Sequence, residues 1–248
     1  MTWSSRFTIA HGRPGSFVEL VDLAHLLTDG TDGTDGARPA FHVVVPSTPG
    51  FGFSPAPAAT GTSPQVVAGL WRSLMRRLGH DRFGVQGGGL GAGTSLRLAL
   101  TFPDDVIAAH LNFSNLVYDP DGERESDPEA GAAADRRRTK WAVDEGGYSH
   151  LHATRLQTLG VALNDSPAGL AAWIPEKFHA WSDRTSSDNE IALPMDHLLT
   201  DLSIYWFTGC ITSSIRIYRE SAANPHFAAM EAPELLAADV RDHVASVR

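Results

Sequence analysis

The sequence is poor in cysteine, with Cys210 alone among 248 residues. One cysteine excludes an internal disulfide framework and a metal site built from several thiolates, and its apolar neighbours predict a buried thiol. The uncharged, glycine-rich stretch that begins at Phe83 is too short and too polar to span a bilayer. The chain does not open with a charged segment followed by an apolar one, so we expect no secretory signal. These absences predict a soluble, cytoplasmic protein.

Positive charge is also scarce. Lys and Arg number 20 against 29 Asp and Glu, which gives a formal net charge of -9. A chain with this balance is poorly suited to nucleic acid or to an anionic membrane, so we expect neither as a partner. Hydrophobic residues make up 42% of the chain and charged residues 20%, which is enough apolar surface for the core of one sizeable domain.

Short apolar runs alternate with segments of helical periodicity over the first half of the chain. The runs expected to be strands are Arg6–Ala10, Phe41–Val45, Arg82–Gln86 and Val106–Phe113. The expected helices are Ser16–Leu27, Pro64–Leu78 and Thr94–Phe102, with Ser16 and Ser63 as N-caps. Alternation with short connections predicts parallel strands joined by crossover helices. The valines of the second run indicate a strand that is buried on both faces.

The second half of the chain has a different character. Residues Asp119–Asp135 are polar, acidic and rich in Gly, Pro and Ala, which predicts a loop or linker. Arg136–Thr208 contains helical segments and no evident strand, so we expect a helical layer on top of the sheet. Pro233–Val247 is amphipathic and is expected to form a final helix.

A glycine-rich turn follows the third expected strand, and it admits two interpretations. The spacing Gly87-x-Gly89-x-x-Ala92 fits a dinucleotide fingerprint, but the next strand ends without the acidic residue that binds the ribose, and no Walker lysine is present. The alternative is a nucleophile elbow, in which small residues flank an exposed nucleophile. Gly87 and Gly91 would be the small residues. Gly89 then holds the position of the nucleophile and has no side chain.

Several separate motifs together resemble the epoxide hydrolases of the α/β-hydrolase fold, of the microsomal and juvenile-hormone type. HGRPGS at His11–Ser16 resembles the HGWPGS turn of that family, with Arg13 where tryptophan is usual. QGGGLG at Gln86–Gly91 resembles QGGDWG, the family's nucleophile elbow. Further matching segments are Pro49–Ser54, Gly147–His150, Ala162–Pro167, Tyr205–Gly209, Ser214–Glu220 and His226–Leu236.

The resemblance implies an α/β fold class, here a truncated α/β-hydrolase with a mostly parallel sheet and a helical lid insertion. It divides the chain into three parts. Residues 1–118 would form the α/β core with the elbow, and residues 119–212 the acidic linker and the lid. Residues 213–248 would form a C-terminal core segment with the histidine loop and a helix.

The family's chemistry assigns a role to several positions. An elbow aspartate attacks an epoxide carbon to form an ester, two lid tyrosines bind the epoxide oxygen, and a histidine activates water. By resemblance, the tyrosines are Tyr148 and Tyr218, and the base is His226. The oxyanion would be held by the backbone amides of Arg13 and Leu90. The implied reaction converts a small apolar epoxide and water to a vicinal diol, without cofactor or metal.

The chain departs from the family's pattern in ways that bear on this chemistry. Gly89 replaces the nucleophilic aspartate, so the ester route is expected to be absent or very weak. The stretch before His226 lacks the family's acid and two of its strands, and Glu220 is the nearest carboxylate that could orient the histidine. The resemblance also leaves the family's N-terminal segment without a counterpart among these residues. Exposed sheet edges are therefore expected, and a homo-oligomer is one way to cover them.

Three functions remain open from the sequence. The chain could be an impaired epoxide hydrolase, or a non-hydrolytic protein that binds or cyclises an epoxide with its tyrosines and His226. It could also be an inactive relic, in which His226 is a polar residue at a helix start and Tyr148 and Tyr218 are packing residues. The other aromatic residues of the lid segments are expected to be core residues rather than substrate contacts: Trp173, Phe178 and Trp181.

Overall fold

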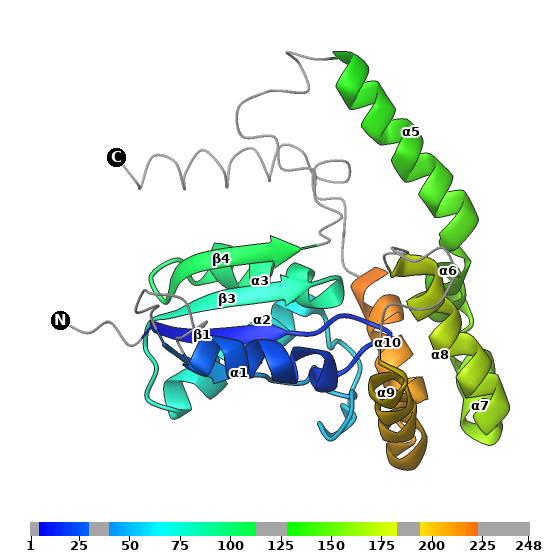
Figure 1. Cartoon of the computed structure of the whole chain (residues 1–248), viewed down its shortest axis with the longest axis horizontal. Helices are drawn as coiled ribbons and strands as arrows, with labels where there is room; N and C mark the ends of the chain where they lie inside the picture. Colours follow the sequence, from blue (N-terminus) through cyan, green and yellow to red (C-terminus); the bar gives the residue numbers. More distant parts are fainter. Residues whose placement is uncertain (1–4, 30–39, 113–127, 183–193, 223–248) are drawn as a thin grey trace.

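A parallel sheet forms the first half of the molecule (Figure 1). The computed structural model describes residues 5–29, 40–112, 128–182 and 194–222. Its strands are β1 (Ser5–Ala10), β2 (Phe41–Val44), β3 (Phe83–Gly88) and β4 (Val106–Asn112). They pair in the order β2-β1-β3-β4, and each of these pairings is parallel. The predicted α/β class is therefore confirmed.

Helices follow the strands as the alternation predicted. A short 3-10 turn (Phe17–Leu20) leads into α1 (Val21–Asp29), and α2 (Pro64–Arg77) and α3 (Leu90–Thr101) follow β2 and β3. The side chain of Ser16 caps the 3-10 turn and that of Ser63 caps α2, which satisfies backbone amides that have no partner inside the helix. Apolar residues of α2, α3 and β3 form one core cluster: Ala68, Met75, Phe83, Val85 and Leu98.

The region around the glycine turn differs from the prediction in its boundaries. β3 continues to Gly88, and α3 begins at Leu90 rather than at Thr94. The backbone amides of Ala92 and Gly93 both donate to the carbonyl of Gly89, at 3.1 and 3.4 Å. The helix therefore starts immediately after the turn, because hydrogen bonding overrides the low helix propensity of the glycines.

The expectation that β2 is buried on both faces is wrong. Its residues are half-buried, and His42 is exposed. β2 is one edge of the described sheet and β4 is the other, with mostly exposed side chains, so each pairs with a neighbour on one side only. An edge strand of this kind leaves backbone groups and one flank uncovered by the described residues.

The second half of the described chain is helical. Its elements are α5 (Pro128–Glu145), α6 (Gly147–Thr154), α7 (Leu156–Asp165), α8 (Pro167–Trp181), α9 (Met195–Thr208) and α10 (Ile211–Ala222). The loop expected over 119–135 is wrong from Pro128 onward, since four alanines near the start of α5 favour a helix over the acidic residues around them. None of the helices in the described ranges has the length and apolar character needed to cross a membrane.

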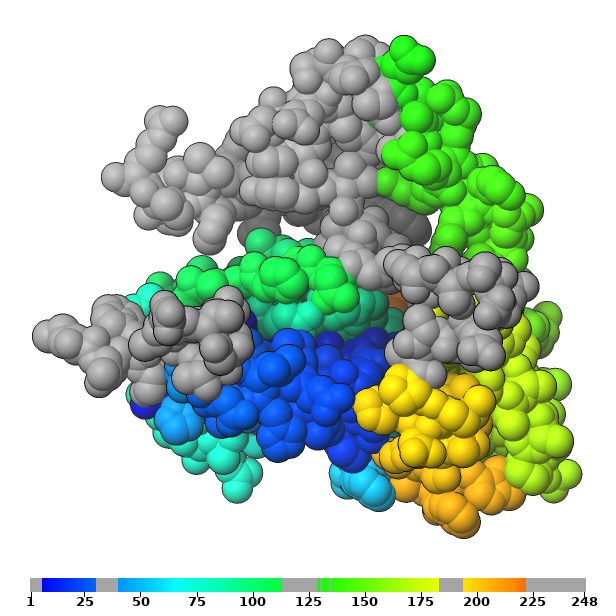
Figure 2. Space-filling model, in the orientation of Figure 1, coloured from blue at the N-terminus to red at the C-terminus, as the bar shows by residue number. Residues whose placement is uncertain are grey.

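The helical layer has a core of its own. Its buried residues come from α7 to α10: Leu163, Leu170, Ile174, Tyr205, Cys210, Ile211 and Ile215. Cys210 is buried, as predicted. Figure 1 shows the layer beyond the carboxyl ends of β3 and β4, and in Figure 2 α9, in yellow, lies directly against the N-terminal residues in blue. Strand ends and helical layer therefore face each other across the region where α/β proteins place their chemistry.

Candidate active site

The glycine turn after β3 has the backbone of a nucleophile elbow. Gly89 has φ 54° and ψ -118°, a conformation that side chains adopt only under strain. A Cβ on Gly87 would collide with the backbone of Gly91, and a Cβ on Gly91 would collide with the carbonyl of Ala10. The flanking glycines are thus needed for the turn to close tightly, as an elbow requires.

The position of the missing nucleophile is open. A Cβ built on Gly89 would have one neighbour within 4 Å outside its adjoining residues, the Cα of Gly12 at 3.6 Å. Gly12 belongs to the turn after β1 that also contains Arg13, and Leu90 is the first residue of α3. The structure therefore places both predicted oxyanion residues in the two backbone segments that meet at Gly89. A side chain at position 89 would therefore have space, and glycine provides none.

The two predicted tyrosines lie together. Tyr148 on α6 and Tyr218 on α10 have ring centroids 5.8 Å apart in an edge-to-face arrangement. His152 lies one helical turn after Tyr148 and contacts both rings, with centroids at 5.4 and 4.8 Å. Trp173 on α8 contacts His152 at 5.9 Å. We call Tyr148, His152, Trp173 and Tyr218 the aromatic cluster.

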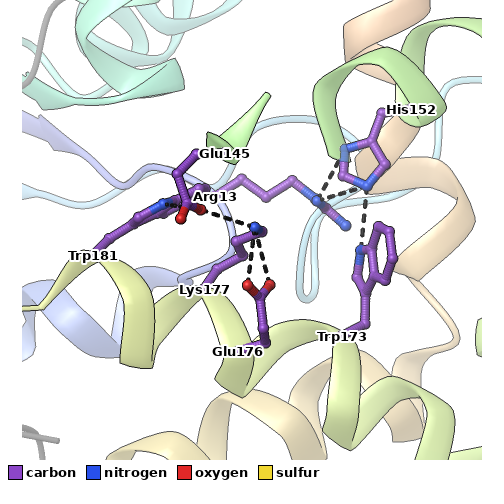
Figure 3. A network of polar contacts seen from close by, with 7 residues as sticks. All are labelled: Arg13, Glu145, His152, Trp173, Glu176, Lys177 and Trp181. Atoms are coloured by element: carbon purple, nitrogen blue, oxygen red, sulfur yellow. Dashed lines mark hydrogen bonds and ion pairs between the residues drawn. The ribbon is translucent and has the colours of Figure 1, made fainter. Parts of the chain in front are cut away.

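His152 was not predicted as a site residue, although its i, i+4 spacing from Tyr148 could have indicated it. It is fully buried. Arg13 Nη1 lies 3.2 Å from both ring nitrogens, and the Trp173 indole nitrogen lies 3.4 Å from Nε2 (Figure 3). Burial, together with the charge of Arg13, lowers the pKa of His152 to about 2. The imidazole is therefore neutral at physiological pH, so one of its two ring nitrogens accepts a hydrogen bond and the other carries the proton.

Both tyrosines keep their protons over the physiological range. Burial raises the pKa of Tyr148 and of Tyr218, and the charge of Arg13 opposes that rise in each case without cancelling it. The Arg13 guanidinium carbon lies 5.9 Å from the centroid of the Tyr218 ring. Two neutral hydroxyls beside a cation can donate hydrogen bonds to an oxygen that gains negative charge.

A second polar group holds Tyr148 from its other side. Glu145, at the end of α5, accepts hydrogen bonds from Lys177 Nζ at 3.1 Å and from the Trp181 indole at 3.0 Å (Figure 3). The ammonium of Lys177 lies 5.5 Å from the Tyr148 ring centroid, and the Trp181 ring lies 5.2 Å from it. These contacts fix the ring of Tyr148 against α8.

Two of the other lid aromatics, Trp173 and Phe178, were expected to be core residues, and their packing agrees with this. Trp173 and Phe178 pack against the core of the helical layer. The indole nitrogens of Trp173 and Trp181 also bond polar residues next to the tyrosines, a role that the sequence pattern did not indicate.

His226, the predicted base, lies outside the described residues. Glu220, which was considered as its orienting acid, is buried, and both of its carboxylate oxygens have partners. One accepts from the backbone amide of Thr62 and the other from Arg216 Nε, each at 2.6 Å. In these contacts Glu220 ties α10 to the loop before α2.

A separate open groove of about 1030 Å³ lies between the loop around Gly52–Gly61 and helices α7 and α10. Neither Gly89 nor a residue of the aromatic cluster lines it. Within the described ranges, no three His, Cys, Asp or Glu side chains are grouped so that they could hold a metal ion. The chemistry-bearing groups are thus the elbow backbone, Arg13 and the aromatic cluster.

The arrangement of sheet, elbow and overlying helices agrees with comparisons to known proteins. Residues 6–140 match the model of the alpha/beta hydrolase fold family, and the chain belongs to that family. Within it, the similarity is to epoxide hydrolases. A protein of Stigmatella aurantiaca, whose own assignment as an epoxide hydrolase is provisional, is 42% identical over 87% of this chain and 49% of the relative. Juvenile hormone epoxide hydrolase 1 of Ctenocephalides felis is 36% identical over 88% of this chain and 50% of the relative.

Solved structures give the same result. The structure of the epoxide hydrolase from Aspergillus niger superposes with a TM-score of 0.74 at 33% identity, over 89% of this chain and 55% of that one. The chain therefore spans about half the length of the curated relatives it matches.

Proposed function

We propose that this chain binds an epoxide at the hydroxyls of Tyr148 and Tyr218 and does not hydrolyse it through an ester intermediate. The observation that carries the proposal is the edge-to-face contact of Tyr148 and Tyr218, which come from helices far apart in the sequence. The similarity to epoxide hydrolases, at 31–42% identity, supplies the class of ligand.

The tyrosine hydroxyls are the groups proposed to act on the epoxide. Each keeps its proton because burial raises its pKa, so each is a hydrogen-bond donor. When an epoxide C–O bond lengthens, negative charge develops on the oxygen, and donors already in position stabilise it. Fixed rings are important here, since donors that must first be ordered lose part of this benefit.

The ester route requires a carboxylate that Gly89 does not provide. Covalent catalysis depends on the nucleophile, and its removal from other enzymes leaves a small residual activity from binding and oxyanion contacts. Arg13 and Leu90 remain the proposed oxyanion donors, and His226 remains the proposed base. Without an ester intermediate there is no oxyanion for the amides to hold and no ester for the histidine to hydrolyse. We therefore expect no hydrolysis by this route, even though the epoxide is bound.

A second candidate is ring opening by a nucleophile within the substrate itself. It is favoured by the intact tyrosine pair beside an elbow that has no reactive side chain. A substrate hydroxyl would attack an epoxide carbon, the C–O bond would break, and a tyrosine would give its proton to the alkoxide. The proton released by the attacking hydroxyl would return to the tyrosinate, so the net reaction is an isomerisation.

Binding and turnover are tested separately. Styrene oxide is titrated into the purified protein by calorimetry, and diol formation is followed in ¹⁸O-labelled water. Binding without labelled diol is expected, and Tyr148→Phe or Tyr218→Phe should weaken it by about three- to tenfold, the effect of losing one hydrogen bond to the neutral epoxide oxygen.

Tyr205→Phe is the matched control. The hydroxyl of Tyr205 is also buried, but it donates to the carbonyl of Gly15 at 3.1 Å rather than into the cluster. Its removal should lower stability and leave the affinity for styrene oxide unchanged. Rapid formation of diol, with an ester trapped on the protein, would contradict the proposal. So would equal binding by all three variants.

A further inference from the structure

Arg13 is a cation among neutral groups. Its Nη1 faces His152, its Nε lies 3.5 Å from the hydroxyl oxygen of Ser214, and its guanidinium lies over the Tyr218 ring. Its Nη2 atom is buried and has no hydrogen-bond partner. A buried donor without an acceptor destabilises a protein, and a charged one more so.

Its neighbours do not offset the charge. His152 is uncharged because burial and Arg13 itself lower its pKa, and Tyr218 keeps its proton. Across the described ranges, no carboxylate lies within ion-pairing distance of Arg13. Lys177, whose ammonium lies 5.5 Å from the Tyr148 ring centroid, illustrates the contrast because it pairs with both Glu145 and Glu176. Of these two cations near the aromatic cluster, Lys177 therefore has carboxylate partners and Arg13 has none among the described residues.

Two carboxyls near the turn of Arg13 are engaged elsewhere. Glu19 accepts a hydrogen bond from the backbone amide of Gly12 at 3.2 Å, and Asp201 accepts one from the hydroxyl of Ser16. Burial raises the pKa of Glu19 to about 7 and that of Asp201 to about 6, so both resist ionisation. Neither contacts the guanidinium.

The elbow provides no anion either. An aspartate at position 89 would project its side chain beside Gly12, next to Arg13 in the chain. With glycine there, the space that such a carboxylate would take is open, and the Arg13 Nη2 donor beside the aromatic cluster has no acceptor.

We propose that the ligand bound beside the aromatic cluster carries a carboxylate, which binds Arg13 Nη2 next to the hydroxyls of Tyr148 and Tyr218. The substrate class is then an epoxide with a carboxylic acid group; the epoxide part of this statement rests on the proposed function. A charge-assisted hydrogen bond from a desolvated guanidinium is among the stronger polar contacts in proteins. The ligand would also neutralise the unpaired cation, so binding should stabilise the fold.

The test begins with a carboxylate that has no epoxide. Benzoate and its neutral isostere benzamide are titrated into the full chain by calorimetry, and the melting temperature is recorded with each. Benzoate is expected to bind at least about tenfold more tightly than benzamide and to raise the melting temperature more. Arg13→Met should remove this preference and leave the weak binding of benzamide unchanged.

Arg219→Met is the matched control, because Arg219 is exposed and lines the separate groove rather than the cluster. It should retain the full preference for benzoate. Arg13→Lys, which keeps the charge, should retain part of the preference, and it serves as the second variant if Arg13→Met does not fold. Equal affinities for benzoate and benzamide, or an undiminished preference in Arg13→Met, would overturn the proposal.

The epoxide part is tested apart from the carboxylate. Phenylglycidate, which carries both groups, should bind more tightly than benzoate, and Tyr218→Phe should remove that gain. If benzoate discrimination is present but phenylglycidate gains nothing, the carboxylate site stands and the proposed epoxide function fails. If styrene oxide binds but benzoate is not preferred over benzamide, the proposed epoxide function stands and the carboxylate site fails.

Discussion

The glycine turn and the aromatic cluster hold different parts of the proposed site. The turn has the backbone conformation of an elbow, with tightly packed glycines on either side of Gly89, but no side chain at its centre. The aromatic cluster has the side chains proposed to bind the ligand, Tyr148 and Tyr218, on two helices that pack together. The difference shows that the shape of a site and its chemistry are encoded by separate residues.

The glycines explain why the elbow keeps its shape. A turn at φ 54° requires a strained conformation from any residue with a Cβ, whereas glycine adopts it freely. Glycine at position 89 therefore forms this turn without the strain that an aspartate would introduce. In the aromatic cluster, by contrast, each side chain is in contact with the next, so a replacement would disturb the packing.

The largest expected effect comes from restoring a carboxylate at the elbow. Gly89→Asp should form a covalent adduct with styrene oxide at least about a thousandfold faster than the unmodified chain, because attack then needs no external nucleophile. Intact-protein mass spectrometry measures the adduct. The strain at this position should lower stability by about 1–3 kcal/mol.

Gly93→Asp is the control for Gly89→Asp. It adds the same carboxylate four residues later, at a position where a Cβ meets nothing within 4 Å. No adduct is expected with it. An adduct on the unmodified chain, or equal adducts with both variants, would show that the elbow is not what limits the chemistry.

The next largest effect is expected on stability, from a methyl group added beside Gly89. Gly91→Ala places a Cβ against the carbonyl of Ala10, which belongs to the neighbouring strand and cannot rotate away. We expect a loss of about 2 kcal/mol or more in the free energy of unfolding, measured with urea. Gly93→Ala, in the open, should instead gain about 0.5–1 kcal/mol from helix propensity. Similar effects of the two changes would refute the close approach at Gly91.

The buried imidazole of the aromatic cluster gives a pH-dependent effect. The pKa of His152 is about 2 in the folded protein against 6.5 as the ordinary value, so the unfolded chain binds more protons between these pH values. Stability that is complete above pH 6.5 should then fall as the pH decreases, with a slope of up to about 1.4 kcal/mol per unit.

His152→Gln isolates this contribution. Glu19 and Asp201 have raised pKa values, so their contribution to stability increases as the pH decreases, opposite to that of His152. The pH dependence of the unmodified chain is therefore the sum of these contributions. Urea unfolding of both proteins from pH 7 to pH 4 measures the difference. A difference that stays constant with pH would mean that His152 is not held neutral.

The smallest effect on ligand binding is expected from Lys177, which lies against the Tyr148 ring. Lys177→Met removes the cation over the Tyr148 ring and its ion pair with Glu145, and should weaken styrene oxide binding about three- to fivefold, close to the value of one such contact. Lys140→Met removes an exposed lysine of α5 and should change nothing. Equal losses in calorimetric titrations of the two would leave no special role for Lys177.

Much of the fold follows from the sequence, and the reasons are local. Strand and helix alternation, the serine caps and the valine-rich runs depend on neighbouring residues, so these elements could be predicted. The burial of β2 could not, because it depends on what lies beside the sheet edge. The start of α5 at Pro128 was missed since acidic and glycine residues outweighed the alanines in the interpretation.

The site shows the same division. Gly89, Tyr148 and Tyr218 could be proposed from motifs, since motifs preserve position. The contact of Arg13 with His152 joins residues 139 positions apart, and no local pattern encodes it. Both residues were visible in the sequence, but the neutral state of His152 follows from its burial beside Arg13 in the folded chain.

The bonds of Glu220 and Arg216 make the two tyrosines unequal as moving parts. Arg216 donates to the carbonyls of Pro57 and Ala59, and Glu220 accepts from the amide of Thr62, so α10 is fastened to the sheet side on both flanks of Tyr218. Tyr148 contacts α8 and α10, and its helix α6 reaches the sheet side through the contact of His152 with Arg13. Within the described residues, α10 is therefore held to the sheet side by more hydrogen bonds than α6. A bulky ligand would enter by displacing α6, whose amides should exchange hydrogen faster than those of α10.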